Sequence, residues 1–334
     1  MSNKGTHFMK LLEWIPIDKL DWHWLVSSNP NAIHLLEKNW DKVDWGGVSL
    51  NPTAIHLLEQ NLDKVHWHWV SYNPNAIQLL EKHLDKVNWK MLSSNPHAIH
   101  LLEKNLDKVD WRWLSKNSNA IPILEKNLDK VDWGWLSANP NAIHILENNL
   151  DKVGWMFLSS NPNAIHLLEK NLDKVHWGWL SQNPNANPIL ENNLDKVHWD
   201  MLCENPNAIH LLENNLDEIN WWNLSKNSNA IPILEKNLDK VNWWQLSANP
   251  NAIHILENNL DKVAWSNLCL NPNIFTYDYN AIKDRMFRNG GIKEELTINR
   301  FAKTNLHKFN SWGFGLDDDD DEIVYETYEE WLKE

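Results

Sequence analysis

Apolar residues recur along this chain at helical spacing within a 22-residue unit, which repeats from Asn29 to Leu270 and begins each time with asparagine. We number the places of the unit from this asparagine, and its commonest form reads NPNAIHLLEKNLDKVxWxWLSx. The apolar residues at places 4, 5, 7, 8 and 12 have helical periodicity. They predict an amphipathic first helix of about eight to ten residues, which Asn-Pro begins and a left-handed asparagine at place 11 ends.

The second part of the unit predicts another short helix. We expect the aspartate of place 13 to cap it, with the tryptophan of place 17 and the leucine of place 20 turned inward and places 14, 18 and 22 turned outward. Proline stands at place 6 in Pro122, Pro188 and Pro232, where it would interrupt the first helix. The sequence therefore predicts two helices for each unit, and a later start of the first helix where proline is present.

Eleven such units follow one another without a slip, over residues 29–270. One unit cannot bury enough apolar surface to offset its conformational entropy, so the units must pack on their neighbours. The fold class predicted is an all-α solenoid of 22-residue two-helix repeats, extended as a curved rod on the order of 100 Å along its axis at roughly 9 to 10 Å for each unit. Residues 1–28 are expected to form a degenerate N-terminal capping repeat and 271–315 a C-terminal helical cap, while 316–334 form an acidic tail.

A leucine-rich-repeat-like solenoid is the structural alternative, because it shares this unit length and contains similar Leu-Ser-x-Asn-Pro strings. When the two patterns are aligned on the asparagine, one position of the leucine ladder falls on place 18, which here holds residues such as Lys90 and Asp200. A second position falls on the asparagine of place 3. The ladder is broken twice, which favours the helical interpretation.

Charge and composition exclude several kinds of partner. Of the net charge of −14, most lies in residues 317–334, which hold ten acidic residues against Lys333. No dense stripe of Lys and Arg is present, so we expect neither nucleic acid nor a membrane as a direct partner. No apolar run is long enough to span a bilayer. Cys203 and Cys269 lie three units apart, which makes a disulfide between them implausible, and the chain is expected to be intracellular.

The recurring polar residues do not predict catalysis or metal binding. Histidine stands at place 6 of seven units, but the units supply one histidine each at wide spacing, whereas structural zinc needs four converging ligands. The glutamate of place 9 and the aspartate of place 13 recur in nearly every unit, as solvated faces and caps do, whereas an active site is one place. We therefore expect no catalytic residue, no metal and no cofactor, and a protein that is not an enzyme.

Three places of the unit, 16, 18 and 22, vary widely while the others form a fixed frame. Places 18 and 22 lie four residues apart and share one side of the second helix. Near the C-terminal end, tryptophan also moves from place 19 to the outward place 18. Exposed tryptophans are frequent binding anchors. The variable side is the candidate recognition face, although it would also vary if nothing constrained it; the candidate partner-binding residues are Tyr72, Lys90, Arg112, Lys116, Trp222, Lys226 and Trp244.

The repeat string LSxNPNAIHLLEKN, the opening segment 14–22 and the closing segment 277–317 resemble uncharacterised tandem-repeat proteins of giant nucleocytoplasmic large DNA viruses. This resemblance implies a viral origin and a location in the host cytoplasm or the virion, and it implies no activity. The function expected is a non-enzymatic repeat scaffold that mediates protein-protein interaction with a host or viral partner. The alternative is a structural component of a virion or viral factory, and the sequence leaves partner identity and oligomeric state open.

Overall fold

The computed structural model describes residues 9–23 and 27–287, which divide into a large unit ending at Thr276 and a second unit beginning at Tyr277. The large unit is an all-helical solenoid, as the periodicity predicts. The first helices of repeats 1 to 11 are α2 (Ile33–Lys38), α4 (Ile55–Gln60), α6 (Ile77–Lys82), α8 (Ile99–Glu103), α10 (Ile121–Glu125), α12 (Ile143–Glu147), α14 (Ile165–Glu169), α16 (Asn187–Glu191), α18 (Ile209–Glu213), α20 (Ile231–Glu235) and α22 (Ile253–Glu257).

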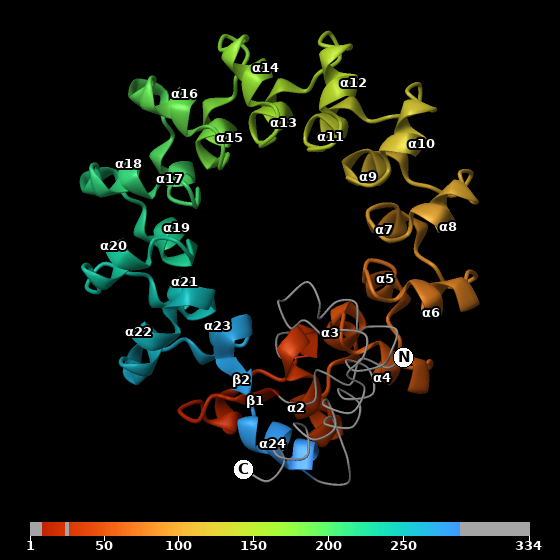
Figure 1. The fold of residues 1–334 in the computed structure, drawn as a ribbon, viewed down its shortest axis with the longest axis vertical. Coiled ribbons are helices and arrows are strands. Elements are labelled where there is room, and N and C mark those ends of the chain that lie inside the picture. Colours follow the sequence, from red (N-terminus) through yellow and green to blue (C-terminus); the bar gives the residue numbers. More distant parts are fainter. Residues whose placement is uncertain (1–8, 24–26, 288–334) are drawn as a thin grey trace, which may run out of the picture. The chain divides into compact units, whose positions relative to one another are not determined.

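The second helices pack against one another from repeat to repeat and lie on the inner side of the series, with the first helices outside them (Figure 1). They are α3 (Trp45–Leu50), α5 (Trp67–Val70), α7 (Trp89–Ser93), α9 (Trp111–Lys116), α11 (Trp133–Ser137), α13 (Trp155–Ser159), α15 (Trp177–Gln182), α17 (Trp199–Leu202), α19 (Trp221–Lys226), α21 (Trp243–Ala248) and α23 (Trp265–Leu268). Two three-residue strands are also present: β1 (Met9–Leu11) lies in the large unit, and β2 (Phe275–Tyr277) spans its boundary with the second unit.

The first helix is shorter than expected, with five or six residues, because it begins at place 5 rather than at the Asn-Pro pair. Proline at place 6, as in Pro122, is then among the first two helical residues, where its missing N–H has no helical partner in any case. The asparagine at place 11 is also not left-handed: Asn61 has φ −137° and donates its side-chain amide to the carbonyl of Leu57 at 2.9 Å. A side-chain bond, not a left-handed turn, therefore satisfies the end of this helix.

The second helix is capped at place 16, not at the aspartate of place 13. Asp132 accepts a hydrogen bond from the backbone N–H of Trp135 at 3.0 Å, and Asp44, Asn88, Asp110, His176, Asn220 and Asn242 do the same for their own helices. The residues of places 12–14 form a turn before it, assigned as a 3-10 helix in Leu194–Lys196 and Leu216–Glu218. Much of the variation at place 16 is thus exchange among capping residues.

The core is a continuous apolar strip that runs through every repeat. Alanine at place 4, leucine at place 8 and the valine or leucine at place 20 are fully buried in all eleven repeats. The tryptophan of place 17 is partly buried against this strip in each of them. The packing therefore uses the frame residues that hardly vary in the sequence, as expected of a solenoid.

Buried polar residues join each repeat to its neighbour. Asn139 donates its side-chain amide to the carbonyls of Ser115 and Asn117, both at 3.0 Å. Ser137 donates its hydroxyl to the carbonyl of Trp133 and accepts from the backbone N–H of Gly154 in the next repeat. The side chains of Asn139 and Ser137 are fully buried. Because buried carbonyl and amide groups need partners, these bonds explain why places 1 and 21 hardly change.

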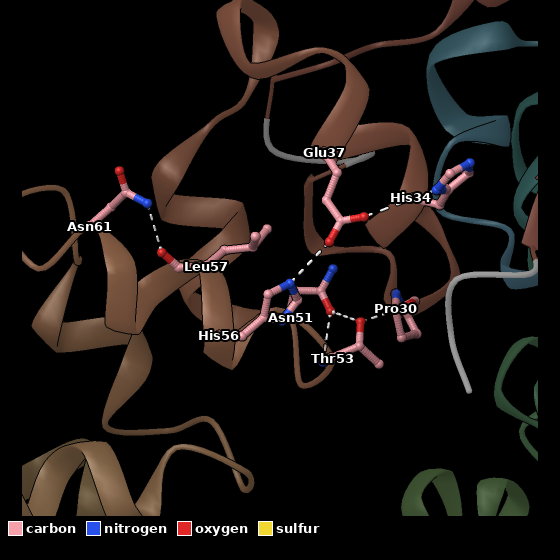
Figure 2. A network of polar contacts seen from close by, with 8 residues as sticks. All are labelled: Pro30, His34, Glu37, Asn51, Thr53, His56, Leu57 and Asn61. Atoms are coloured by element: carbon pink, nitrogen blue, oxygen red, sulfur yellow. Dashed lines mark hydrogen bonds and ion pairs between the residues drawn. The ribbon is translucent and has the colours of Figure 1, made fainter. Parts of the chain in front are cut away.

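The same register is visible between repeats 1 and 2 (Figure 2). Thr53, at place 3, donates its hydroxyl to the carbonyl of Pro30 at 2.8 Å, a role that asparagine fills in most other repeats. His56 contacts Glu37 of the preceding repeat at 3.1 Å. Place 3 therefore varies in residue type while it keeps a hydrogen-bond donor.

The first and last repeats are joined by a composite twelfth repeat. Asn271–Ile274 supply its first places, and the turn Ile17–Lys19, followed by Asp21 and Trp22, supplies its later ones. The bonds follow the internal register: Asn29 donates to the carbonyls of Cys269 and Asn271, and Asp21 N–H donates to the Sγ atom of Cys269 at 3.2 Å. In addition, β1 pairs with β2.

The repeats thus follow one another around a closed circle (Figure 1). We expected an open rod with a capping segment at each end, and the structure differs because the terminal halves complement each other. The half-unit at residues 17–22 can be recognised in the sequence, but the complementary half, Asn271–Ile274, lies about 250 residues away in the chain.

The second unit contributes one described helix, α24 (Tyr279–Phe287). The rest of the expected C-terminal cap, to residue 315, and the acidic tail 316–334 lie outside the described residues.

Candidate functional site

The candidate recognition face consists of places 18 and 22 of the second helices, together with place 19, which the structure adds to it. We call this set the second-helix face. Place 18 is exposed in most repeats, and place 19 is mostly half-buried beside it. The face runs along the helices on the inner side of the circle of repeats (Figure 1).

Repeats 3 to 5 bring three of the predicted cations onto tryptophan rings. Lys90 Nζ lies 5.7 Å from the ring centroid of Trp113, while the Arg112 guanidinium and Lys116 Nζ lie 5.5 and 5.0 Å from that of Trp135. The two indoles are stacked, with centroids 6.2 Å apart. Each cation is thus held over the indole ring of the following repeat, an attractive arrangement. This section of the face is basic and aromatic.

Repeats 9 and 10 bring Trp222 and Trp244 together. Their rings stack with centroids 5.5 Å apart and an interplanar angle of 16°, and each side chain remains 48% exposed. The neighbouring place 19 holds Asn223 and Gln245, not the usual tryptophan. The tryptophan shift in the sequence therefore produces a paired aromatic surface that is open to solvent.

Lys226 is occupied by an ion pair that the sequence did not suggest. Its Nζ atom lies 2.7 Å from Glu204, which also accepts from Gln182 at 2.8 Å. Gln182, Glu204 and Lys226 stand at place 22 of consecutive repeats. Opposite charges at the same place of two neighbouring repeats were therefore the sequence signal for this ion pair. Asp200, at place 18, accepts from the Asn220 side chain at 2.8 Å. Repeat 8 is therefore the acidic section of the face.

Tyr72 is 49% exposed at place 22 of repeat 2. Among the described contacts, none joins Tyr72 to the basic section or to the tryptophan pair. The structure thus gathers five of the seven predicted residues into two groups, pairs Lys226 with Glu204, and leaves Tyr72 outside both groups.

Histidine and glutamate of the first helices form a separate series on the outer side. Six histidines at place 6 lie 2.6 to 3.1 Å, from Nε2 to Oε1, from the place-9 glutamate of the preceding repeat. In the part of the chain that the structure describes, no three His, Cys, Asp or Glu side chains converge as metal ligands. The histidines therefore pair neighbouring repeats.

No protein-family model, curated protein or solved structure matches this chain. Within residues 9–23 and 27–287, none of the helices has the length and apolar character needed to cross a membrane.

Proposed function

We propose that this protein is a non-enzymatic repeat scaffold that binds a protein partner through its second-helix face. The exposed pair Trp222 and Trp244 carries this proposal. Fully burying a large apolar side chain contributes about 1.5 to 3 kcal/mol, and these two rings leave much of that contribution unused in the free chain. Tryptophan is also among the residues most enriched at the energetic centres of interfaces.

The arrangement of charge supports a specific partner rather than general adhesion. The same face is basic in repeats 3 and 4, with Lys90, Arg112 and Lys116, and acidic in repeat 8, with Asp200 and Glu204. Complementary charge of this kind orients a partner and excludes wrong ones. We assign no catalytic residue, since the candidate acid and base pairs recur in repeat after repeat.

The resemblance to tandem-repeat proteins of giant DNA viruses leads us to propose a viral protein that engages a host or viral partner in the host cytoplasm or the virion. The alternative role is a structural component of a virion or viral factory in which chains pack side by side, since closure of the repeats leaves no repeat end for end-to-end stacking. Both terminal repeat surfaces are already joined to each other through Asn29, Asn271 and Asp21.

The test is affinity capture with the native chain and with the double variant Trp222→Ala, Trp244→Ala. Trp40→Ala is the matched control, because Trp40 is also exposed (43%) and stacked, on Trp45, but lies outside the second-helix face. We expect the double variant to lose a stoichiometric partner that the native chain and Trp40→Ala both retain. Retention of the partner by all three proteins would overturn the proposal.

A further inference from the structure

A second row of cation–aromatic contacts runs through the repeats and involves the lysine of place 14. In nine pairs of neighbouring repeats its Nζ atom lies 4.8 to 5.4 Å from the ring centroid of the place-17 tryptophan of the preceding repeat. Lys42 does the same over Trp22 of the composite repeat. The ring face of this tryptophan is therefore a place where the fold repeatedly holds a cation.

Repeat 9 departs from this row, because place 14 holds Glu218 there. The turn Leu216–Glu218 has the same form as Leu194–Lys196, from which Lys196 reaches Trp177 at 4.9 Å. Among the described residues no cation lies over Trp199, and Glu218 is exposed without an ion pair. At place 14, repeat 9 thus has a carboxylate where the other repeats have the lysine of this row.

The surroundings of Trp199 are the most acidic part of the repeat series. Residues 183–226 hold seven acidic residues against Lys196 and Lys226, and both lysines are already engaged, over Trp177 and with Glu204. The neighbouring second helix presents Trp222. The local charge and the aromatic surface therefore both suit a partner that carries positive charge.

We infer that Trp199 and Glu218 form a binding site for an arginine side chain in a basic segment of the partner protein. The guanidinium lies on the indole face and pairs with the Glu218 carboxylate, so that the partner supplies the cation which lysine supplies elsewhere. Arginine suits this position better than lysine because its planar group both stacks and makes paired hydrogen bonds. The inference rests on the proposed function and names the chemistry of the partner.

The experiment measures binding of a fluorescein-labelled hexa-arginine peptide by fluorescence anisotropy at about 150 mM salt, where long-range attraction is screened. Every protein is the full chain with Asp317 to Asp321 replaced by serine, so that the acidic run of the tail does not compete. Glu218→Lys restores the residue found in the other repeats. Glu213→Lys, in the outer helix α18 of the same repeat, makes the same charge change away from Trp199.

We expect Glu218→Lys to raise the Kd of the peptide by about tenfold or more, because it removes the cation–aromatic contact and its ion pair and sets a like charge against the guanidinium. Glu213→Lys should raise it by less than about twofold. Lys196→Glu should create a second site over Trp177, seen by calorimetry as a rise from one bound peptide to two. The inference is overturned if the native chain does not bind the peptide, if the two glutamate variants lose affinity equally, or if Lys196→Glu leaves the stoichiometry unchanged.

Partner capture separates this inference from the proposed function. If Trp222→Ala, Trp244→Ala abolishes capture and Glu218→Lys leaves it unchanged, the face binds the partner but the arginine site is wrong. If neither change affects capture, both are wrong.

Discussion

Asn29 donates its side-chain amide to the backbone carbonyl of Asn271 at 3.3 Å, although the two residues lie 242 positions apart in the chain. Every asparagine at place 1 makes this bond to its counterpart in the preceding repeat, as Asn139 does to Asn117. Asn29 and Asn271 are therefore neighbours in register, and the composite repeat continues the series without a break in its hydrogen bonding.

Closure predicts that Asn29 stabilises the fold in the same way as an internal asparagine. Asn29→Ala should lower the free energy of unfolding in urea by about 1 to 2 kcal/mol, because it removes two bonds to buried carbonyls, and Asn139→Ala by about 2 kcal/mol. Asn141→Ala, whose bond to Ser118 is exposed, should cost less than about 0.5 kcal/mol.

Hydrogen exchange provides an independent check of closure. The Leu12 N–H donates to the Ile274 carbonyl at 2.9 Å, so it should exchange slowly in the native protein. Exchange at the rate of an unfolded peptide, together with an Asn29→Ala variant as stable as the native chain, would show that the series is open in solution.

The period and the frame residues were sufficient to predict the all-helical solenoid, because a unit that cannot bury its own apolar face must stack. The predicted cap of the second helix, at place 13, is wrong. Asp at place 13 hardly varies between repeats, which made it the obvious capping residue. The residue that caps the helix, at place 16, differs between repeats as Asp, Asn or His, so its common role is not evident from the sequence. The sequence pattern alone does not predict closure, because the half-unit at residues 17–22, which contains places 12 to 17 of a repeat, also fits a terminal cap.

The candidate face was predictable in part. Variation between repeats located Trp222 and Trp244, which the structure finds exposed. The Lys226 ion pair with Glu204 depends on which side chains of neighbouring repeats meet, and a single repeat does not contain that information. The sequence shows lysine at place 14 and tryptophan at place 17 in nearly every repeat. Only the structure shows that this lysine lies over the tryptophan ring of the preceding repeat.

Place 6 should tolerate proline wherever it occurs. His144→Pro should cost less than about 1 kcal/mol, because place 6 is the second residue of α12 and the same place holds proline in α10. Leu146→Pro, two residues further on, should cost about 3 kcal/mol or more, because Leu146 N–H donates to the Ala142 carbonyl and its side chain is fully buried. Urea unfolding followed by circular dichroism measures both. Equal losses would mean that the helix begins before place 5.

Restoring the lysine row should stabilise the protein. Glu218→Lys is expected to raise the free energy of unfolding by about 0.5 to 1 kcal/mol, as a cation returns to the face of Trp199. Lys152→Ala should lower it by a similar amount, because Lys152 lies 4.8 Å from the ring centroid of Trp133. Glu213→Lys is the charge-matched control and should have little effect. A Glu218→Lys variant less stable than this control would contradict the role assigned to the row.

Cys203 should be unreactive in the folded protein. Burial raises the pKa of its thiol from 9.0 to about 11, so at pH 8 the thiolate population is about a hundredfold below that of a free thiol. Iodoacetamide should label it only after unfolding. The unfolded chain loses this proton before the folded chain does, so stability should fall as the pH rises from 9 to 11. Cys203→Ser, which restores the residue found in other repeats, should remove that part of the decline; rapid labelling of the native thiol would contradict the buried placement.

The most direct test of partner binding through the second-helix face is site-specific photo-crosslinking in an extract of the cells that naturally make the chain. A benzophenone amino acid replaces Trp222 on the face in one protein and His210 on the outer helix α18 in another. We predict one cross-linked partner protein from position 222 and none from position 210. The same products from both positions, or none from position 222, would show that the protein does not bind a partner through the second-helix face.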